Sequence, residues 1–300
     1  MQRIVKSIDY DYAEMKKIID ALCCRNPILQ PLTIGKSCAG RDITAIKINS
    51  GTEYVLFVAA FHGSEHITSN VLLMFLEEFA LAYTHNDSIA DINVRKAMGN
   101  RGIIFVPCVN PDGCEISIRG ALGCGKDAGN IYKICKGDFT HWNANLRGVD
   151  INHNFDAGWQ NLHQLEQKSG ILGPSATRFG GYAPHSEPET IALVKLCKEY
   201  NIHHALALHS QGEVIYWSYN GYESKTSRQM AEIMAATSGY ALDVPVGLAY
   251  GGGFKDWFIS EYLRPAFTVE LGKGKNPLPI TDAQKIYSHI REMLTITAIM

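Results

Sequence analysis

The sequence predicts an α/β fold in which a central mixed, mostly parallel β-sheet is flanked by helices on both faces. Apolar, β-branched runs alternate with helical patterns along the chain, and the run at 102–109 is apolar enough for an internal strand. The 300 residues, 46% hydrophobic and 19% charged, can bury a sizeable core, which excludes global disorder. We expect residues 1–300 to form a single domain.

Hydrophobic periodicity predicts the elements in order. Residues 9–24 have apolar side chains at helical spacing, which predicts a helix. The β-branched segments 42–48 and 54–60 flank the turn Gly51-Thr52, which predicts a hairpin. Ser186 is expected to cap a helix over 186–200. Stretch 110–185, rich in Gly, Asn and Asp, predicts a long functional loop region. The other expected elements are helices at 67–83, 225–238 and 281–298 and strands at 102–109, 205–209 and 214–217.

Charge and composition limit the classes of partner. With 28 basic and 30 acidic side chains and a net charge of -2, nothing favours binding to nucleic acid or to an anionic membrane. No apolar run reaches the length of a membrane span, about 18 residues. The N-terminus lacks an apolar signal core, so we predict a cytoplasmic protein whose eight cysteines are reduced thiols.

Two histidines and a glutamate predict a metal site at the ends of strands. An apolar run over 55–61 is followed by His62 and Glu65, and a second run over 205–208 ends at His209. Catalytic zinc takes three such protein ligands, and sites in α/β sheets lie at the carboxyl ends of strands. Glu270 interrupts another apolar run, and a buried carboxylate there predicts a general base. The alternative interpretation of His62-x-x-Glu65 alone is a polar surface turn.

These motifs together resemble those of the zinc carboxypeptidase family. His62-x-x-Glu65, His209 and Phe267-Thr-Val-Glu270 stand in the family's order, and the match covers about residues 35–275. The resemblance implies one Zn²⁺ per chain, bound by His62, Glu65 and His209, with Glu270 as general base. It also implies that Asp150 orients His62 from behind. Three further segments agree with the family pattern: Asn110-Pro-Asp-Gly113, Gly148-Val-Asp-Ile-Asn-His-Asn-Phe155 and Asp256-Trp257.

The sequence departs from the family where carboxypeptidases hold the substrate's terminal carboxylate and the oxyanion. His153 stands where the family has an arginine clamp, so ordinary C-terminal exopeptidase activity is in doubt, and Asn152 remains as a polar contact. Asn143 stands where an arginine often stabilises the oxyanion. Arg147 lies nearby in the sequence and is the expected substitute, or else a structural ion-pair partner.

Two further departures concern substrate binding. Leu248 replaces the family's mobile tyrosine, which leaves Tyr250 as the local substitute. Lys255, just before Asp256-Trp257, would favour a carboxylate on the substrate, unless it is simply solvated. The segments Trp142-x-Ala-Asn-x-Arg-Gly-Val-Asp150 and Glu270-Leu-Gly-Lys-Gly-Lys-Asn-Pro-Leu-Pro279 resemble the bacterial γ-D-glutamyl-meso-diaminopimelate peptidase branch.

The resemblance implies a zinc metallopeptidase that cleaves the γ-D-glutamyl-meso-diaminopimelate bond of peptidoglycan stem peptides. Zinc-activated water would attack the amide, with Glu270 as base, and the partner would be a peptide or muropeptide. The expected setting is recycling of imported muropeptides in the cytosol, or a compartment such as a developing spore. The alternatives are a conventional metallocarboxypeptidase, a small-molecule deacylase and an inactive muropeptide-binding module.

Overall fold

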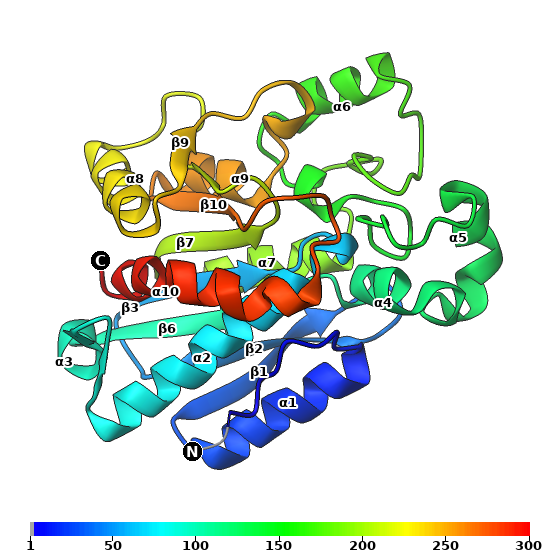
Figure 1. Cartoon of the computed structure of the whole chain (residues 1–300). Helices are drawn as coiled ribbons and strands as arrows, with labels where there is room; N and C mark the ends of the chain where they lie inside the picture. The colour runs from blue at the N-terminus through cyan, green and yellow to red at the C-terminus, as the bar shows by residue number, and fades with distance from the viewer. Residues whose placement is uncertain (1–2) are drawn as a thin grey trace.

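The computed structural model describes residues 3–300, and one large sheet organises them (Figure 1). Over these residues the sheet runs in the order β1-β2-β6-β3-β7-β10-β8-β9. Parallel neighbours are β6–β3, β3–β7, β7–β10 and β8–β9, and the other pairs are antiparallel, so the mixed, mostly parallel α/β class is confirmed. The strands are β1 Leu29–Lys36, β2 Asp42–Ile48, β3 Glu53–Ala59, β6 Arg101–Val106, β7 Ile202–His209, β8 Val214–Tyr216, β9 Ala241–Asp243 and β10 Ala266–Glu270, with β4 Ser88–Ile89 and β5 Ile92–Asn93 in a separate small sheet.

Helices cover both faces of the sheet, as β3 illustrates. Val55 and Phe57 belong to one core, with α1, α2, α3, α8 and α10, whereas Leu56 and Val58 face α7 and α9. Figure 1 shows α2 and α10 crossing the near face, while α4, α5 and α6 lie beyond one end of the strands. No helix in residues 3–300 is both long and apolar enough to cross a membrane. The α-helices are α1 Tyr12–Arg25, α2 Ile67–His85, α3 Val94–Met98, α4 Pro111–Arg119, α5 Ala128–Cys135, α6 Trp159–Lys168, α7 Pro188–Glu199, α8 Lys225–Ser238, α9 Phe254–Tyr262 and α10 Ala283–Ile299; short 3-10 helices span Gly63–Glu65, Gly120–Leu122, Gly125–Asp127, Ile151–His153, Gly247–Ala249 and Ile280–Asp282.

The predicted hairpin between 42–48 and 54–60 is wrong, because β6 lies between β2 and β3. β3 is buried on both faces, and such a strand needs hydrogen-bonded neighbours on both sides within the sheet centre. β2 pairs instead with β1, a strand that the sequence patterns did not predict. β1 contains Pro31 and Gly35 and is mostly exposed or half-buried, so it lacks the apolar run of a central strand.

The stretch 110–185 is more ordered than the predicted loop region. It contains α4, α5 and α6, and α4 begins with a recognisable signal. The Oδ1 atom of Asn110 accepts a hydrogen bond from Gly113 N at 2.9 Å, and Pro111 follows in the first turn. The cap at Ser186 is also corrected, because α7 begins one residue later without a side-chain cap. The helices predicted at 9–24, 67–83, 225–238 and 281–298 are present as α1, α2, α8 and α10.

Candidate active site

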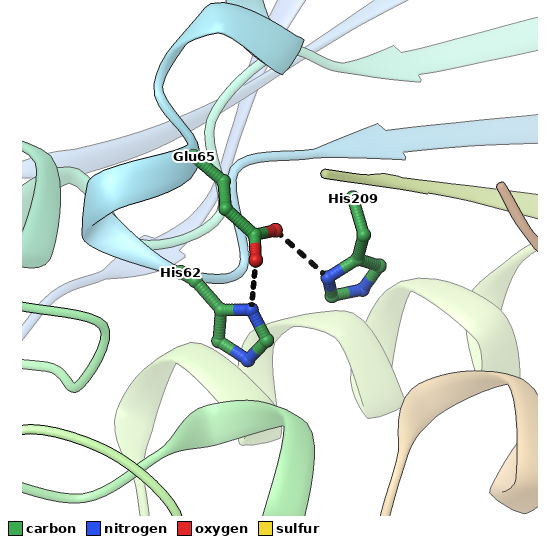
Figure 2. A group of neighbouring side chains, drawn as sticks. All are labelled: His62, Glu65 and His209. Carbon is green, nitrogen blue, oxygen red and sulfur yellow. Dashed lines mark hydrogen bonds and ion pairs between the residues drawn. The ribbon is translucent and has the colours of Figure 1, made fainter. Parts of the chain in front are cut away.

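His62, Glu65 and His209 meet at the carboxyl ends of β3 and β7. His62 Nδ1 lies 2.9 Å from one Glu65 carboxylate oxygen, and His209 Nδ1 lies 3.1 Å from the other. Figure 2 shows the carboxylate of Glu65 between the two imidazole rings. One ligand atom from each residue lies within 4.8 Å of those of the other two. Segments far apart in the sequence therefore present two nitrogens and a carboxylate to one point in space.

The local backbone explains how His62 and Glu65 reach this point. β3 ends at Ala59, and the short 3-10 helix Gly63–Glu65 turns the chain back against α4. A Cβ atom at Gly63 would lie 2.3 Å from Gly113 O and 2.5 Å from Trp142 O. Only glycine fits this approach, so Gly63 is what allows the turn that brings the histidine and the glutamate together.

Asp150 holds His62 from the other side of the ring. Its Oδ1 atom lies 3.1 Å from His62 Nε2, and its Oδ2 atom accepts the backbone N–H of Arg178 at 2.8 Å. Burial would raise the pKa of Asp150, but His62, His153 and the backbone N–H of Arg178 hold it far below its usual range. Burial alone would lower the pKa of His62, but Glu65 and Asp150 raise it well above its ordinary value. The ring is thus fixed at both nitrogens.

Glu270 stands directly beside His209. The two residues are register partners in the parallel strands β10 and β7, and Glu270 lines the same cavity as the three converging side chains. Burial, followed by the nearby charge of Glu65, raises the pKa of Glu270 to about 8. A carboxyl group with a pKa near neutrality can both accept and return a proton, which is what general acid–base chemistry requires.

Glu65 is held by a polar pair that the sequence analysis missed. Asn276 Nδ2 lies 3.4 Å from Glu65 Oε1, and Ser210 N donates to Glu65 Oε2 at 3.2 Å. Asn276 is itself fixed by Ser210, whose Oγ atom donates to Asn276 Oδ1 at 2.8 Å. Asn276 lies in the segment Lys-Gly-Lys-Asn-Pro that served only to mark a subfamily, so no local pattern indicated this role.

A cavity of about 240 Å³ opens over these groups. Three of the predicted substrate-binding residues, Asn152, His153 and Lys255, line it. His153 Nδ1 lies 2.8 Å from Glu166 Oε1, and Lys255 Nζ forms an ion pair with Asp256 and donates to Ser218 O at 2.7 Å. The ammonium group of Lys255 is therefore neither solvated nor unpaired.

Two residues that were predicted for the site lie outside this cavity. Arg147 is exposed, lies 3.6 Å from Glu187 and does not line the cavity, which corrects its expected role at the oxyanion. Tyr250 lines a neighbouring cavity instead, where its hydroxyl oxygen accepts the N–H of Asn220 at 3.1 Å. Both predictions relied on nearness in sequence, whereas the backbone turns between these residues and the site direct them elsewhere.

A sequence model of zinc carboxypeptidases matches residues 15–295. The chain belongs to the zinc carboxypeptidase family. It is therefore a zinc metallopeptidase and a hydrolase. It is 36% identical over 282 residues to γ-D-glutamyl-L-diamino acid endopeptidase 1 of Lysinibacillus sphaericus, an alignment that covers 93% of this chain and 69% of that protein.

Solved structures show the same fold. Carboxypeptidase A of Helicoverpa armigera superposes with a TM-score of 0.73 at 20% identity, covering 97% of this chain and 73% of that one. The murein-tripeptide amidase MpaA of Escherichia coli O157 superposes with a TM-score of 0.56 at 22% identity, covering 89% and 91%. These likenesses establish the architecture of a zinc carboxypeptidase for this chain.

The donor set fits the zinc ion on which this family depends. Two imidazoles and a carboxylate are a common ligand set of catalytic zinc. Burial lowers the pKa of His209, although Glu65 opposes this, which favours the neutral ring with the lone pair that a ligand needs. The pKa of His62 is raised, so metal binding there would displace a proton. With Asp150 at Nε2, His62 presents its Nδ1 atom to the same point.

Proposed function

We propose that this zinc carboxypeptidase homologue cleaves the amide between γ-D-glutamate and meso-diaminopimelate in peptidoglycan stem peptides. The observation that carries the proposal is the pairing of His153 with Glu166 where carboxypeptidases have an arginine clamp. An imidazole cannot grip a terminal carboxylate in the bidentate manner of a guanidinium. The name of the relative from L. sphaericus, a γ-D-glutamyl-L-diamino acid endopeptidase, supports the same bond class.

The reaction follows from the groups that surround the scissile amide. His62, Glu65 and His209 would hold one Zn²⁺, which when bound supplies Lewis-acid polarisation of the carbonyl and acidification of water. Glu270 takes the proton of the attacking water molecule and then donates it to the departing amine nitrogen of diaminopimelate. Asp150 would accept the Nε2–H of His62, so that Nδ1 is the ring nitrogen that would hold the Zn²⁺ once its own proton has left.

Asn143 is the proposed donor to the oxyanion in place of Arg147. It lines the cavity, and its Oδ1 atom accepts the hydroxyl of Ser64 at 2.5 Å. Ser64 lies between His62 and Glu65, so this bond anchors Asn143 to the metal-binding turn and leaves the amide N–H groups to donate. A single side-chain donor to an oxyanion typically contributes about a hundredfold to a thousandfold in kcat.

The decisive experiment uses the defined tripeptide L-Ala-γ-D-Glu-meso-diaminopimelate. Product masses should show L-Ala-D-Glu and free diaminopimelate, and a chelator should abolish both products. Glu270→Gln should retain zinc and lose hydrolysis, because the amide cannot accept the proton. If this variant cleaves the tripeptide as fast as the parent, the proposed mechanism is wrong. If neither product forms with the parent protein, the proposed substrate is wrong.

A matched pair of peptides separates this function from that of an ordinary carboxypeptidase. An exopeptidase needs the free terminal carboxylate, so it would hydrolyse an α-linked peptide and spare its C-terminally blocked form. A binding module without activity would retain the muropeptide and release nothing.

We propose that residues 1–300 act as one catalytic domain in the cytoplasm, in recycling of muropeptides, because all eight cysteines are free thiols. Fractionation that finds the protein outside intact cells would contradict this location.

A further inference from the structure

The charges that line the reactive cavity are unevenly compensated. Glu65, Asp150, Asp256 and Glu270 contribute carboxylates to its wall. Its two permanently basic side chains are Lys255 and Arg178, and Lys255 is already paired with Asp256. Arg178 is exposed, and within residues 3–300 its guanidinium group has neither a hydrogen bond nor an ion pair. The cavity therefore presents one cation that is available for a ligand.

The backbone at Arg178 is fixed although its side chain is free. Arg178 N donates to Asp150 Oδ2 at 2.8 Å, and Asp150 N donates to Phe179 O at 2.7 Å. These two bonds attach the segment to the carboxylate that orients His62, and the fully buried ring of Phe179 anchors the next residue. Arg178 also adopts φ +66°, a left-handed conformation that costs an L-residue roughly 1 kcal/mol. The surrounding contacts hold it there, so the root of the side chain is pre-positioned at the cavity wall.

A γ-linked glutamate brings a charge that an ordinary peptide lacks. Its α-carboxylate remains free and is joined to the scissile carbonyl only by a short saturated chain. Glu65 and Asp150 face His62, and a bound Zn²⁺ would compensate them further, so the cation left to attract this anion at the cavity wall is the guanidinium group of Arg178. A guanidinium group keeps its charge at every physiological pH and binds a carboxylate through paired N–H donors.

We propose that Arg178 is the specificity-determining residue that binds the free α-carboxylate of the D-glutamyl residue. This inference rests on the proposed function, because it names the group that the same cavity recognises on the acyl side of the cleaved bond. Within residues 3–300 the guanidinium group of Arg178 has no hydrogen bond or ion pair with the three proposed metal ligands or with Glu270. We therefore expect it to act on substrate affinity rather than on proton transfer. The structure also explains why Arg147 cannot take this role, since Arg147 lies outside the cavity against Glu187.

The test compares Arg178→Ala and Arg178→Lys with Arg147→Ala, a matched control that also removes an exposed arginine. The substrates are the tripeptide with free carboxylates, an analogue with the D-glutamyl α-carboxylate amidated, and an analogue with diaminopimelate amidated. For Arg178→Ala we expect KM for the free tripeptide to rise by roughly 10- to 100-fold, the value of a hydrogen-bonded charged partner. The value of kcat should change little, and Arg178→Lys should recover part of the affinity. For the analogue with an amidated glutamyl carboxylate, KM should change little in either variant.

A second readout needs no turnover. Calorimetry on metal-depleted protein should show that L-Ala-D-Glu, the acyl product, binds the parent and Arg147→Ala equally and Arg178→Ala about tenfold more weakly or worse. If Arg178→Ala loses the same factor on free and glutamyl-amidated substrates, the inference is overturned. It is also overturned if the rise in KM caused by Arg178→Ala disappears on the analogue with amidated diaminopimelate and persists on the analogue with an amidated glutamyl carboxylate. Failure of the parent protein to cleave any of the three peptides would sink the proposed function, whereas the calorimetry would still decide the role of Arg178.

Discussion

Asp150 shows how one carboxylate sets the chemistry of a neighbouring ring. Its Oδ1 atom lies 3.1 Å from His62 Nε2, so it would hold a proton on Nε2 while Nδ1 binds the proposed zinc ion. In Asp150→Asn the amide can still accept the N–H of Arg178 but can offer an N–H to His62 Nε2, which favours the opposite tautomer. We expect zinc affinity to fall by about 10- to 100-fold. Competition with a chromophoric chelator measures it, and equal affinity in parent and variant would contradict the role. Asp156→Asn, at an exposed position, is the control.

We expect Glu189 to make the stability of the protein depend on pH, separately from its catalysis. This side chain in the first turn of α7 is fully buried beside Cys38 and Asn145, and burial raises its pKa from 4.5 to about 7. Between these two values the folded state keeps a proton that the unfolded state has lost. Raising the pH through this window should therefore lower the free energy of unfolding, by up to about 3 kcal/mol from this group.

The measurement for Glu189 is the urea unfolding of parent and Glu189→Gln at pH 5 and pH 8. The parent should lose more stability between these values than the variant, because glutamine has no proton to lose. Glu199→Gln changes an exposed carboxylate on the same helix and should leave the difference unchanged. Parallel pH dependence in parent and Glu189→Gln would show that Glu189 is ionised alike in the folded and unfolded states.

At the scale of elements, α4 is locked to the turn between β1 and β2. Asp112, in the first turn of α4, accepts Ser37 Oγ at 2.7 Å, Ala39 N at 2.7 Å and Arg41 Nη1 at 2.6 Å. Asp112 is fully buried and Arg41 largely so. Removing the carboxylate leaves three donors without their acceptor, and Arg41 keeps only its longer contacts with Glu115 at 3.5 Å and Gly123 O at 3.4 Å. We expect Asp112→Ala to cost about 3–5 kcal/mol in the free energy of unfolding, measured by urea denaturation.

The same hairpin contains the control for this prediction. Lys36 and Asp42 form an ion pair at 2.6 Å, but both side chains face solvent. Water and salt screen such a pair, so Lys36→Ala should leave the unfolding midpoint almost unchanged. If the two variants lower the free energy of unfolding equally, burial is not the cause of the contribution that Asp112 makes to stability.

At the scale of the whole molecule, the hydrophobic cores lie on the two faces of the sheet, and the proposed metal-binding residues lie at the carboxyl ends of the central strands β3 and β7. Chelation should therefore lower the melting temperature without unfolding the chain at 25 °C. A ligand present at a hundred times its Kd stabilises the folded state by about 2.7 kcal/mol, which corresponds to roughly 5 °C for a protein of this size. Far-UV circular dichroism should be unchanged, and added zinc should restore the melting temperature. Loss of helical signal on chelation would mean that the metal holds the fold.

Local patterns predicted the fold class and indicated the proposed reacting groups, because both depend on short stretches of chain. Apolar runs that end in His62, His209 and Glu270 indicate buried strands with polar groups at their carboxyl ends, and parallel strands bring such ends to one edge. Strand order escaped prediction, since the turn at Gly51-Thr52 is compatible with a hairpin and with a chain that leaves for a distant position. The pairing of β6 with both β2 and β3 decides between them, and it involves residues about fifty positions further along the chain.

The sequence by itself determined the family and the residues for which we propose a role, because His62, Glu65, His209 and Glu270 stand at the ends of apolar runs in the family's order. The tertiary structure alone decided which charged side chains line the cavity over these residues. Arg147 is near Asp150 in sequence but pairs with Glu187, whereas Arg178 is distant in sequence and is joined to Asp150 by a backbone hydrogen bond. Which of two surface arginines meets a substrate depends on long-range contacts between loops, and no short pattern in a single sequence records those contacts.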